Sequence, residues 1–142
     1  MATARWCHYD HQADIGLRGY GADLSEAFTQ AALALTGVIT DPARVQPETA
    51  VTVECRATDA EFLLVEWLDE LIYRMATRHL LFGRFEVVVD ADGRHLTATA
   101  WGEAVDRQRH QPAVEVKGAT LTDLRVTQAA PGRWVAQCVV DV

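Results

Sequence analysis

The chain has 142 residues, of which 49% are hydrophobic and 23% are charged. This size and composition indicate one globular domain, spanning residues 1–142, around a single hydrophobic core. Thirteen Lys and Arg residues stand against twenty Asp and Glu, so the net charge is −7. An acidic chain lacks the positive field that attracts proteins to nucleic-acid phosphates, so we expect no strong direct binding of nucleic acid.

Neither a targeting segment nor a membrane span is expected. Residues 1–6 lack the apolar run of a signal peptide. The longest apolar helical stretch, around residues 31–35, is far shorter than the roughly 20 residues that cross a bilayer. Cys7, Cys55 and Cys138 are odd in number and show no CxxC spacing. They are interpreted as reduced thiols, which favours a cytoplasmic protein.

Two short strands, at residues 6–8 and 15–20, precede the first predicted helix. Asp23 followed by Glu26 is typical of a capping box at a helix start. Apolar residues then recur with helical spacing. The helix is expected to end at Asp41–Pro42, because the residue before a proline disfavours helical backbone.

A strand of alternating apolar and polar side chains is predicted at residues 49–55. Thr58 with Glu61 predicts a second capping box, and a wide apolar stripe then marks the second helix. The members of this stripe are Phe62, Leu64, Val65, Leu68, Leu71, Ile72 and Met75.

The rest of the chain has the pattern of strands. Residues 85–89 and 96–101 flank Asp90–Gly93, and its Asp-Gly step favours a hairpin turn. Further strands are expected at residues 113–121, 124–128 and 134–142. Two helices and about seven strands in one domain predict an α+β fold, a two-layer sandwich. Both helices would cover one face of a mostly antiparallel sheet.

A candidate metal site combines residues near the two ends of the chain. Asp14 stands at the start of a predicted strand, and Asp141 lies in an apolar strand next to the α-carboxylate of Val142. If strand pairing brings Asp14 alongside, three anionic groups converge, an arrangement that suits hard cations such as Ca²⁺ or Mg²⁺. Three outcomes stay open for these charges: a metal ion, a neighbouring cationic side chain, or exposure to solvent.

Other polar residues allow both functional and ordinary interpretations. His8 and His11 are three residues apart without a further zinc ligand, so an orienting role is favoured over ligation. His110 lies in residues 106–112, which form either the main basic patch or an ordinary solvated loop. Lys117 alternates with apolar neighbours, and its side chain either points to solvent or faces the acidic cluster.

The sequence lacks the motifs of a self-sufficient enzyme of two common classes. Its glycines form neither a phosphate-binding P-loop nor a dinucleotide-binding fingerprint. It also contains no nucleophile elbow and no Cys/His pair in a catalytic context. The chain therefore lacks the parts of a self-sufficient NTP-using or acyl-transfer enzyme.

The stretch His11–Gly16, followed by Gly21–Phe28, resembles the opening of the archease family. Further matching elements follow in the same order along the chain: Glu66–Leu71, Gly102–Glu103, Arg109–His110, Glu115–Lys117 and Val140–Val142. The match extends over essentially the whole chain. One departure is that Leu121 and Thr122 stand where many archeases have an aromatic residue and a histidine.

The resemblance implies a non-enzymatic accessory protein of the RtcB-type RNA ligase. That ligase joins 3′-phosphate or 2′,3′-cyclic-phosphate ends to 5′-hydroxyl ends in tRNA splicing and RNA repair. Archeases promote guanylylation of that ligase and its multiple turnover. They bind a divalent cation, usually calcium, with magnesium or manganese as alternatives. The ligands implied here are Asp14, Asp141 and Val142. Lys117 matches a lysine that accompanies them, and His11 and His110 are taken as accessory residues.

Two alternatives come from other functional classes. The first is a small metal-dependent phosphohydrolase or phosphotransferase that uses the same carboxylates. The second is a chaperone-like interaction module with a structural metal. Turnover by the isolated protein would favour the first alternative, and only stimulation of the ligase separates the accessory protein from the second.

Overall fold

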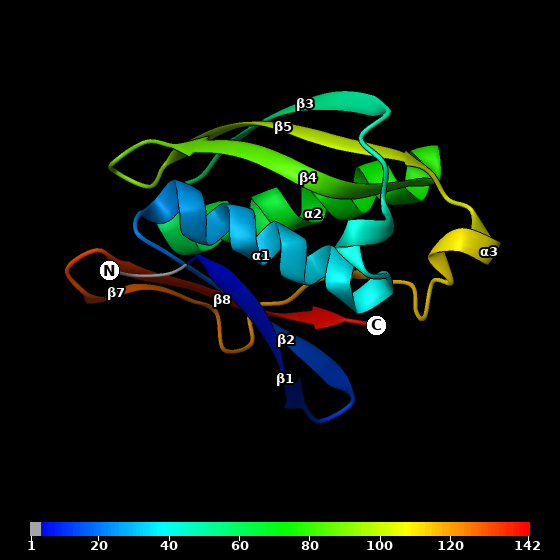
Figure 1. Ribbon diagram of the computed structural model, residues 1–142. Helices are drawn as coiled ribbons and strands as arrows, with labels where there is room; N and C mark the ends of the chain where they lie inside the picture. Colours follow the sequence, from blue (N-terminus) through cyan, green and yellow to red (C-terminus); the bar gives the residue numbers. More distant parts are fainter. Residues whose placement is uncertain (1–3) are drawn as a thin grey trace.

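Two antiparallel sheets enclose a layer of two long helices in the computed structural model, which describes residues 4–142 (Figure 1). One sheet contains five strands: β1 (Arg5–His11), β2 (Asp14–Gly21), β6 (Gly118–Ala119), β7 (Arg125–Ala130) and β8 (Arg133–Asp141). The other contains three: β3 (Thr49–Arg56), β4 (Leu80–Val89) and β5 (His95–Ala104). The helices are α1 (Leu24–Ile39), α2 (Ala60–Arg78) and the short α3 (Arg107–His110), with a 3₁₀ turn at Pro42–Arg44.

The predicted α+β class is confirmed, but the expectation of a two-layer sandwich with both helices on one face of a single sheet is wrong, because α1 packs on β2 and on β4, which belong to different sheets. The structure adds that the strands divide into two sheets, so that the helices have one sheet on each side (Figure 1). In the five-stranded sheet the order is β1-β2-β8, and both β6 and β7 pair with the far edge of β8. The three-stranded sheet has the order β3-β5-β4. No helix within residues 4–142 is long and apolar enough to cross a membrane.

The two long helices begin at capping aspartates. The carboxylate of Asp23 accepts the backbone N–H of Glu26 at 2.8 Å, and the Glu26 side chain accepts the N–H of Ala22 at 3.0 Å. The predicted cap and its partner are confirmed, with the Glu26 side chain bonded to the N–H one residue before the cap. For α2 the predicted cap is wrong by one residue: Asp59, not Thr58, is the cap, and its side chain accepts the N–H of Phe62 at 2.9 Å.

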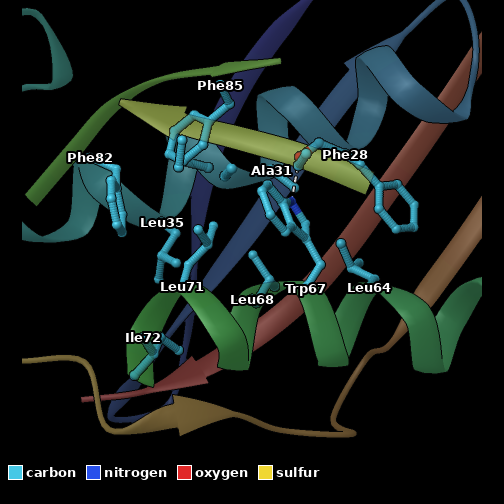
Figure 2. Packing of buried hydrophobic residues seen from close by; sticks show 14 of the residues in the cluster. Phe28, Ala31, Leu35, Leu64, Trp67, Leu68, Leu71, Ile72, Phe82 and Phe85 are labelled. Carbon is cyan, nitrogen blue, oxygen red and sulfur yellow. Dashed lines mark hydrogen bonds between the residues drawn. The ribbon is translucent and has the colours of Figure 1, made fainter. Parts of the chain in front are cut away.

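The apolar stripe of α2 forms the centre of the core (Figure 2). Trp67, Leu68 and Leu71 are fully buried. The indole N–H of Trp67 donates a 3.1 Å hydrogen bond to the backbone oxygen of Phe28 in α1, drawn as a dashed line in Figure 2. This bond satisfies the only polar atom of a buried indole. Phe62, predicted as part of the stripe, is instead 47% exposed, because it lies on the solvent side of the first turn.

The strand predicted over residues 113–121 is wrong for most of its length. Only Gly118–Ala119 pairs with a neighbour, in register with the end of β8. Before that point the backbone follows the end of α1, where the N–H of Ala113 donates a 2.8 Å hydrogen bond to the oxygen of Ile39. Alternating apolar residues therefore lie here in an irregular segment that crosses the helix layer.

Close packing of α1 on β2 depends on a glycine. A Cβ on Gly19 would lie 2.3 Å from the backbone oxygen of Ala27 and 2.4 Å from the backbone nitrogen of Ala31. Both atoms belong to the helix backbone, which has no freedom to rotate away as a side chain does. The contact of α1 with the five-stranded sheet therefore needs glycine at this position.

We predict that Gly19→Ala lowers the free energy of unfolding by about 1–3 kcal/mol, the usual cost of overpacking a tight contact. Urea unfolding of the two proteins measures the difference. Gly118→Ala is the matched control, because its new Cβ would meet only the Asp69 Oδ1 atom at 3.7 Å, an ordinary contact. Equal stability of the Gly19 variant and the wild type would contradict the proposed close approach.

Candidate functional site

Pairing of β2 with β8 brings Asp14 and Asp141 together. The register places Ile15 opposite Val140, so the next position sets Asp14 opposite Asp141. Residues opposite each other in an antiparallel pair project from the same face of the sheet. Val140 is fully buried against the helix layer. Since side chains alternate along a strand, both aspartates belong to the outer face, away from the helices.

Two further residues reach the same end of the sheet. The N–H of Lys117 donates a 2.8 Å hydrogen bond to the backbone oxygen of Asp141, and Gly118 is paired with Asp141 in the register. Lys117 is exposed, whereas Val142 is half-buried and packs against the core. The structure thus brings together Asp14, Asp141, Val142 and Lys117, which are far apart in the sequence.

The donor chemistry of this sheet end fits a hard cation. Within residues 4–142, the ion pairs include neither Asp14 nor Asp141. In the same part of the chain, no three His, Cys, Asp or Glu side chains lie close enough to hold a metal ion by themselves. A cation bound by the two carboxylates therefore requires further oxygen donors, and the oxygen atoms of Val142 are the nearest along the chain. An all-oxygen set of this kind suits calcium, magnesium or manganese.

His11 pairs with Asp14 in the β1–β2 register, but its imidazole has a different acidic neighbour. The Nε2 atom lies 3.8 Å from Oδ2 of Asp123, in the loop before β7. Sequence reasoning missed Asp123, because nothing in the pattern of that loop indicates a long-range contact. The structure therefore places the His11 imidazole beside Asp123, and its orienting role stays a prediction.

A chain of polar contacts fixes the loop that carries Asp123. Arg18 Nε donates a 2.7 Å hydrogen bond to Gln137 Oε1, and Gln137 Nε2 donates a 2.9 Å bond to the backbone oxygen of Asp123. The Arg18 guanidinium also lies 4.3 Å from the ring centre of Tyr9. The Tyr9 ring packs directly over Gly16, because a Cβ on Gly16 would lie 2.1 Å from a ring carbon. This explains why the matching His11–Gly16 stretch ends in glycine.

A second cluster surrounds the buried carboxylate of Glu103, at the end of β5. Arg109 donates two hydrogen bonds to it, at 2.6 and 2.5 Å, and the backbone N–H of Gln46 donates a third at 2.7 Å. Glu103 is 3% exposed. These bonds, with that of Arg109 the strongest cause, lower the pKa of Glu103 to about 2. The carboxylate is thus a fixed anion that holds α3 against the sheet.

His110, taken from the sequence as an accessory residue, completes this cluster. Its ring is buried, and its Nδ1 accepts the backbone N–H of Asp106 at 2.8 Å. The neutral imidazole therefore carries its proton on Nε2, which donates to Glu103 Oε2 at 2.9 Å. The backbone oxygen of His110 accepts the hydroxyl of Thr40. The geometry gives His110 a structural role, because both ring nitrogens are bonded inside the protein.

The fold and the sheet-end cluster define a small α+β protein with a candidate oxygen-donor site on one sheet. The sequence model of the Archease protein family (MTH1598/TM1083) matches residues 6–142. The protein archease of Pyrococcus furiosus is 41% identical over 140 residues, which cover 97% of this chain and 99% of that one. The archease of Thermococcus gammatolerans is 42% identical with the same coverage. The chain belongs to the archease family, which confirms the resemblance found in its motifs.

Solved structures agree with this assignment. The solution structure of Methanobacterium thermoautotrophicum protein 1598 has a TM-score of 0.82 and 36% identity, and covers 96% of this chain and 98% of that one. The crystal structure of an archease from Thermotoga maritima, described as a possible chaperone, has a TM-score of 0.58 at 11% identity and covers 94% of both chains. The second match shows a shared fold.

We predict that Glu103→Gln lowers the free energy of unfolding at neutral pH by about 1–3 kcal/mol, because two charged hydrogen bonds from Arg109 are weakened. The folded pKa of Glu103, about 2, is below the unfolded value of about 4.3. The stabilisation is therefore complete above the unfolded pKa and is lost as pH falls through the folded one. Urea unfolding as a function of pH should show the two proteins converging over this window.

The matched control for this prediction is Glu86→Gln on β4, whose carboxylate is 68% exposed beside Arg84. Its stability should change by less than about 0.5 kcal/mol, with no difference that depends on acid. A Glu103 variant that behaves like this control would show that the buried cluster does not stabilise the fold.

Proposed function

We propose that this archease is a non-enzymatic activator of an RtcB-type RNA ligase, and that it promotes ligase guanylylation and multiple turnover in tRNA splicing or RNA repair. The β2–β8 pairing carries the proposal, because it sets Asp14 opposite Asp141 with Lys117 bonded to the same strand end. These residues occupy the positions that matched the family pattern. We call Asp14, Asp141, Val142 and Lys117 the acidic tip.

The acidic tip would hold a divalent cation, most simply Ca²⁺. The carboxylates of Asp14 and Asp141 supply anionic oxygens, and Val142 supplies a further oxygen donor. The paired strands fix these groups before the metal arrives, so little ordering is required on binding. When bound, the cation supplies positive charge that reduces the repulsion between an acidic surface and phosphate groups.

Lys117 supplies a positive charge at the same end of the sheet. Its backbone is bonded to Asp141, and its side chain is exposed, so the ammonium is accessible to a partner or to a nucleotide phosphate. A lysine binds phosphate as a compact point charge. We propose that the acidic tip docks at the mouth of the ligase active site, where it helps to arrange metal and nucleotide for guanylylation.

The charge of the chain supports action through a protein partner. With a net charge of −7, direct attraction to RNA phosphates is unfavourable. The RNA is then bound by the ligase, and the archease acts on the ligase and its nucleotide. Under this proposal the isolated archease has no turnover of its own with nucleotides or phosphate esters.

We predict that Asp14→Ala, Asp141→Ala and Lys117→Ala each reduce stimulation of multiple-turnover ligation about tenfold or more. Loss of a contact worth about 1.4 kcal/mol accounts for a factor of ten. The measurement uses the RtcB-type ligase of the same organism, GTP and RNA with the appropriate ends. Single-turnover guanylylation is followed separately.

Asp92→Asn in the β4–β5 turn is the control, because it removes a carboxylate elsewhere and keeps the oxygen that accepts the N–H of Arg94. It should stimulate like the wild type. Undiminished stimulation by all three tip variants would refute the proposed site, and phosphate release by the isolated archease would favour a hydrolase instead.

We also predict that calcium stabilises the wild type and does not stabilise Asp14→Asn or Asp141→Asn. Binding to the folded state alone stabilises by about 2.7 kcal/mol at one hundredfold excess over Kd, which amounts to several degrees in Tm. Thermal unfolding with calcium and with EDTA measures the shift. A shift that persists in both variants would place the calcium elsewhere.

A further inference from the structure

Asp69, on the exposed side of α2, is bonded to the short strand β6. Its Oδ1 atom accepts a 2.8 Å hydrogen bond from the backbone N–H of Ala119. The same oxygen lies 3.7 Å from the place that a Cβ on Gly118 would take. The carboxylate therefore lies directly over β6, which an ordinary solvated helix residue does not do.

This bond satisfies the backbone N–H on the edge of β6 that faces away from β8. On the other edge, the N–H groups of Lys117 and Thr120 donate to β8 at 2.8 and 2.9 Å. The N–H of Ala119 has no strand to bond with and is satisfied by Asp69 instead. Helix α2 thus takes the place of a neighbouring strand at this edge.

The strands that carry the two aspartates of the acidic tip are joined by more backbone pairing than β6, which follows Lys117. The β2–β8 ladder, which Asp14 and Asp141 directly adjoin, has seven residue pairs. Strand β6 is two residues long, and the stretch 111–117 before it forms neither helix nor strand. Among the residues of the tip, Lys117 therefore depends most on a contact outside the sheet.

The charge of Asp69 also affects the Cys138 thiol in β8. Burial is the main cause that raises the pKa of the Cys138 thiol to about 12, and the nearby carboxylate of Asp69 raises it further. Cys138 belongs to the helix side of β8, and its Sγ lies 3.3 Å from the backbone oxygen of Thr120. This agrees with a carboxylate placed where α2, β6 and β8 meet.

We propose that Asp69 is a positioning residue of the acidic tip: through the backbone of Ala119 it fixes Lys117 beside Asp141. The proposal rests on the proposed function and adds to it a residue on a helix that holds none of the metal ligands. Asp69 is not among the proposed metal ligands, and its contacts are with the backbone of β6. Its action runs through one hydrogen-bond acceptor, which makes the role testable by isosteric replacement.

The test compares Asp69→Ala with Asp69→Asn. Asparagine keeps the oxygen acceptor and loses the charge, whereas alanine loses both. Asp69→Ala should lose ligase stimulation to the same extent as Lys117→Ala, and the double variant should be no worse than either one, because both changes act through one contact. Asp69→Asn should stimulate the ligase like the wild type. Glu66→Ala, which removes an exposed carboxylate three residues earlier on α2, should also leave stimulation unchanged.

Two further measurements separate positioning from general destabilisation. Calcium should still stabilise Asp69→Ala, because the β2–β8 ladder stays intact. Amide hydrogen exchange at Ala119 should become faster by about fivefold, the equivalent of a hydrogen bond of about 1 kcal/mol. The fold should persist, since the freed N–H is able to reach water at this exposed edge. Asp69→Glu, which displaces the acceptor by one methylene, gives a second variant that keeps the charge.

The outcomes for Asp69 and for the proposed function are distinguishable. Loss of stimulation in Lys117→Ala with full stimulation in Asp69→Ala would overturn the positioning role alone. Equal loss in Asp69→Asn and Asp69→Ala would show that charge matters, not the acceptor, and would also overturn it. Full stimulation by Lys117→Ala would refute the proposed function, and unchanged exchange at Ala119 would independently refute the bond from Asp69.

Discussion

Burial of the apolar side of β8 determines where the candidate ligands lie. Ala136, Cys138 and Val140 are fully buried against the helix layer. Because side chains alternate along a strand, a slip of one residue would move these groups to the opposite face of the sheet and turn Asp141 toward the helix layer. Apolar burial, at about 25 cal/mol per Å², therefore sets the register that places Asp14 opposite Asp141. Two like charges are held together by packing on the other face of the same strands.

The acidic tip has two aspartates on regular strands and a lysine on an irregular segment. The two aspartates lie on the continuous β2–β8 ladder, whereas Lys117 lies in a segment that leaves β5 and crosses the helix layer with little regular structure. Polar anchors hold this segment at both ends: Glu103 bonds α3 before it, and Asp69 bonds β6 after it. A buried carboxylate with a pKa of about 2 remains ionised across the physiological range, so the first anchor is permanent.

Local chemistry made much of the fold predictable. The Asp23 capping box, the apolar stripe of α2 and the Asp90–Gly93 turn all involve residues a few positions apart, where propensity and periodicity act directly. For residues 113–121 the same reasoning predicted a strand, which is wrong for most of that length. Its alternation is typical of a strand, yet its backbone bonds to the end of α1, and pattern alone does not distinguish a strand from an extended crossing segment.

The sequence by itself determined the two long helices, most strands, the α+β class and the residues that mark the family. It also named Asp141 as a candidate, because an acidic residue within an apolar strand is unusual wherever the strand lies, and it named Asp14 and Lys117 through their match to the family pattern. Only the tertiary structure decided that the strands form two sheets, that His110 is buried with Glu103, and that Asp69 reaches Ala119. Glu103 and His110 are seven residues apart and Asp69 and Ala119 are fifty apart, and neither contact leaves a periodic signal in a single sequence.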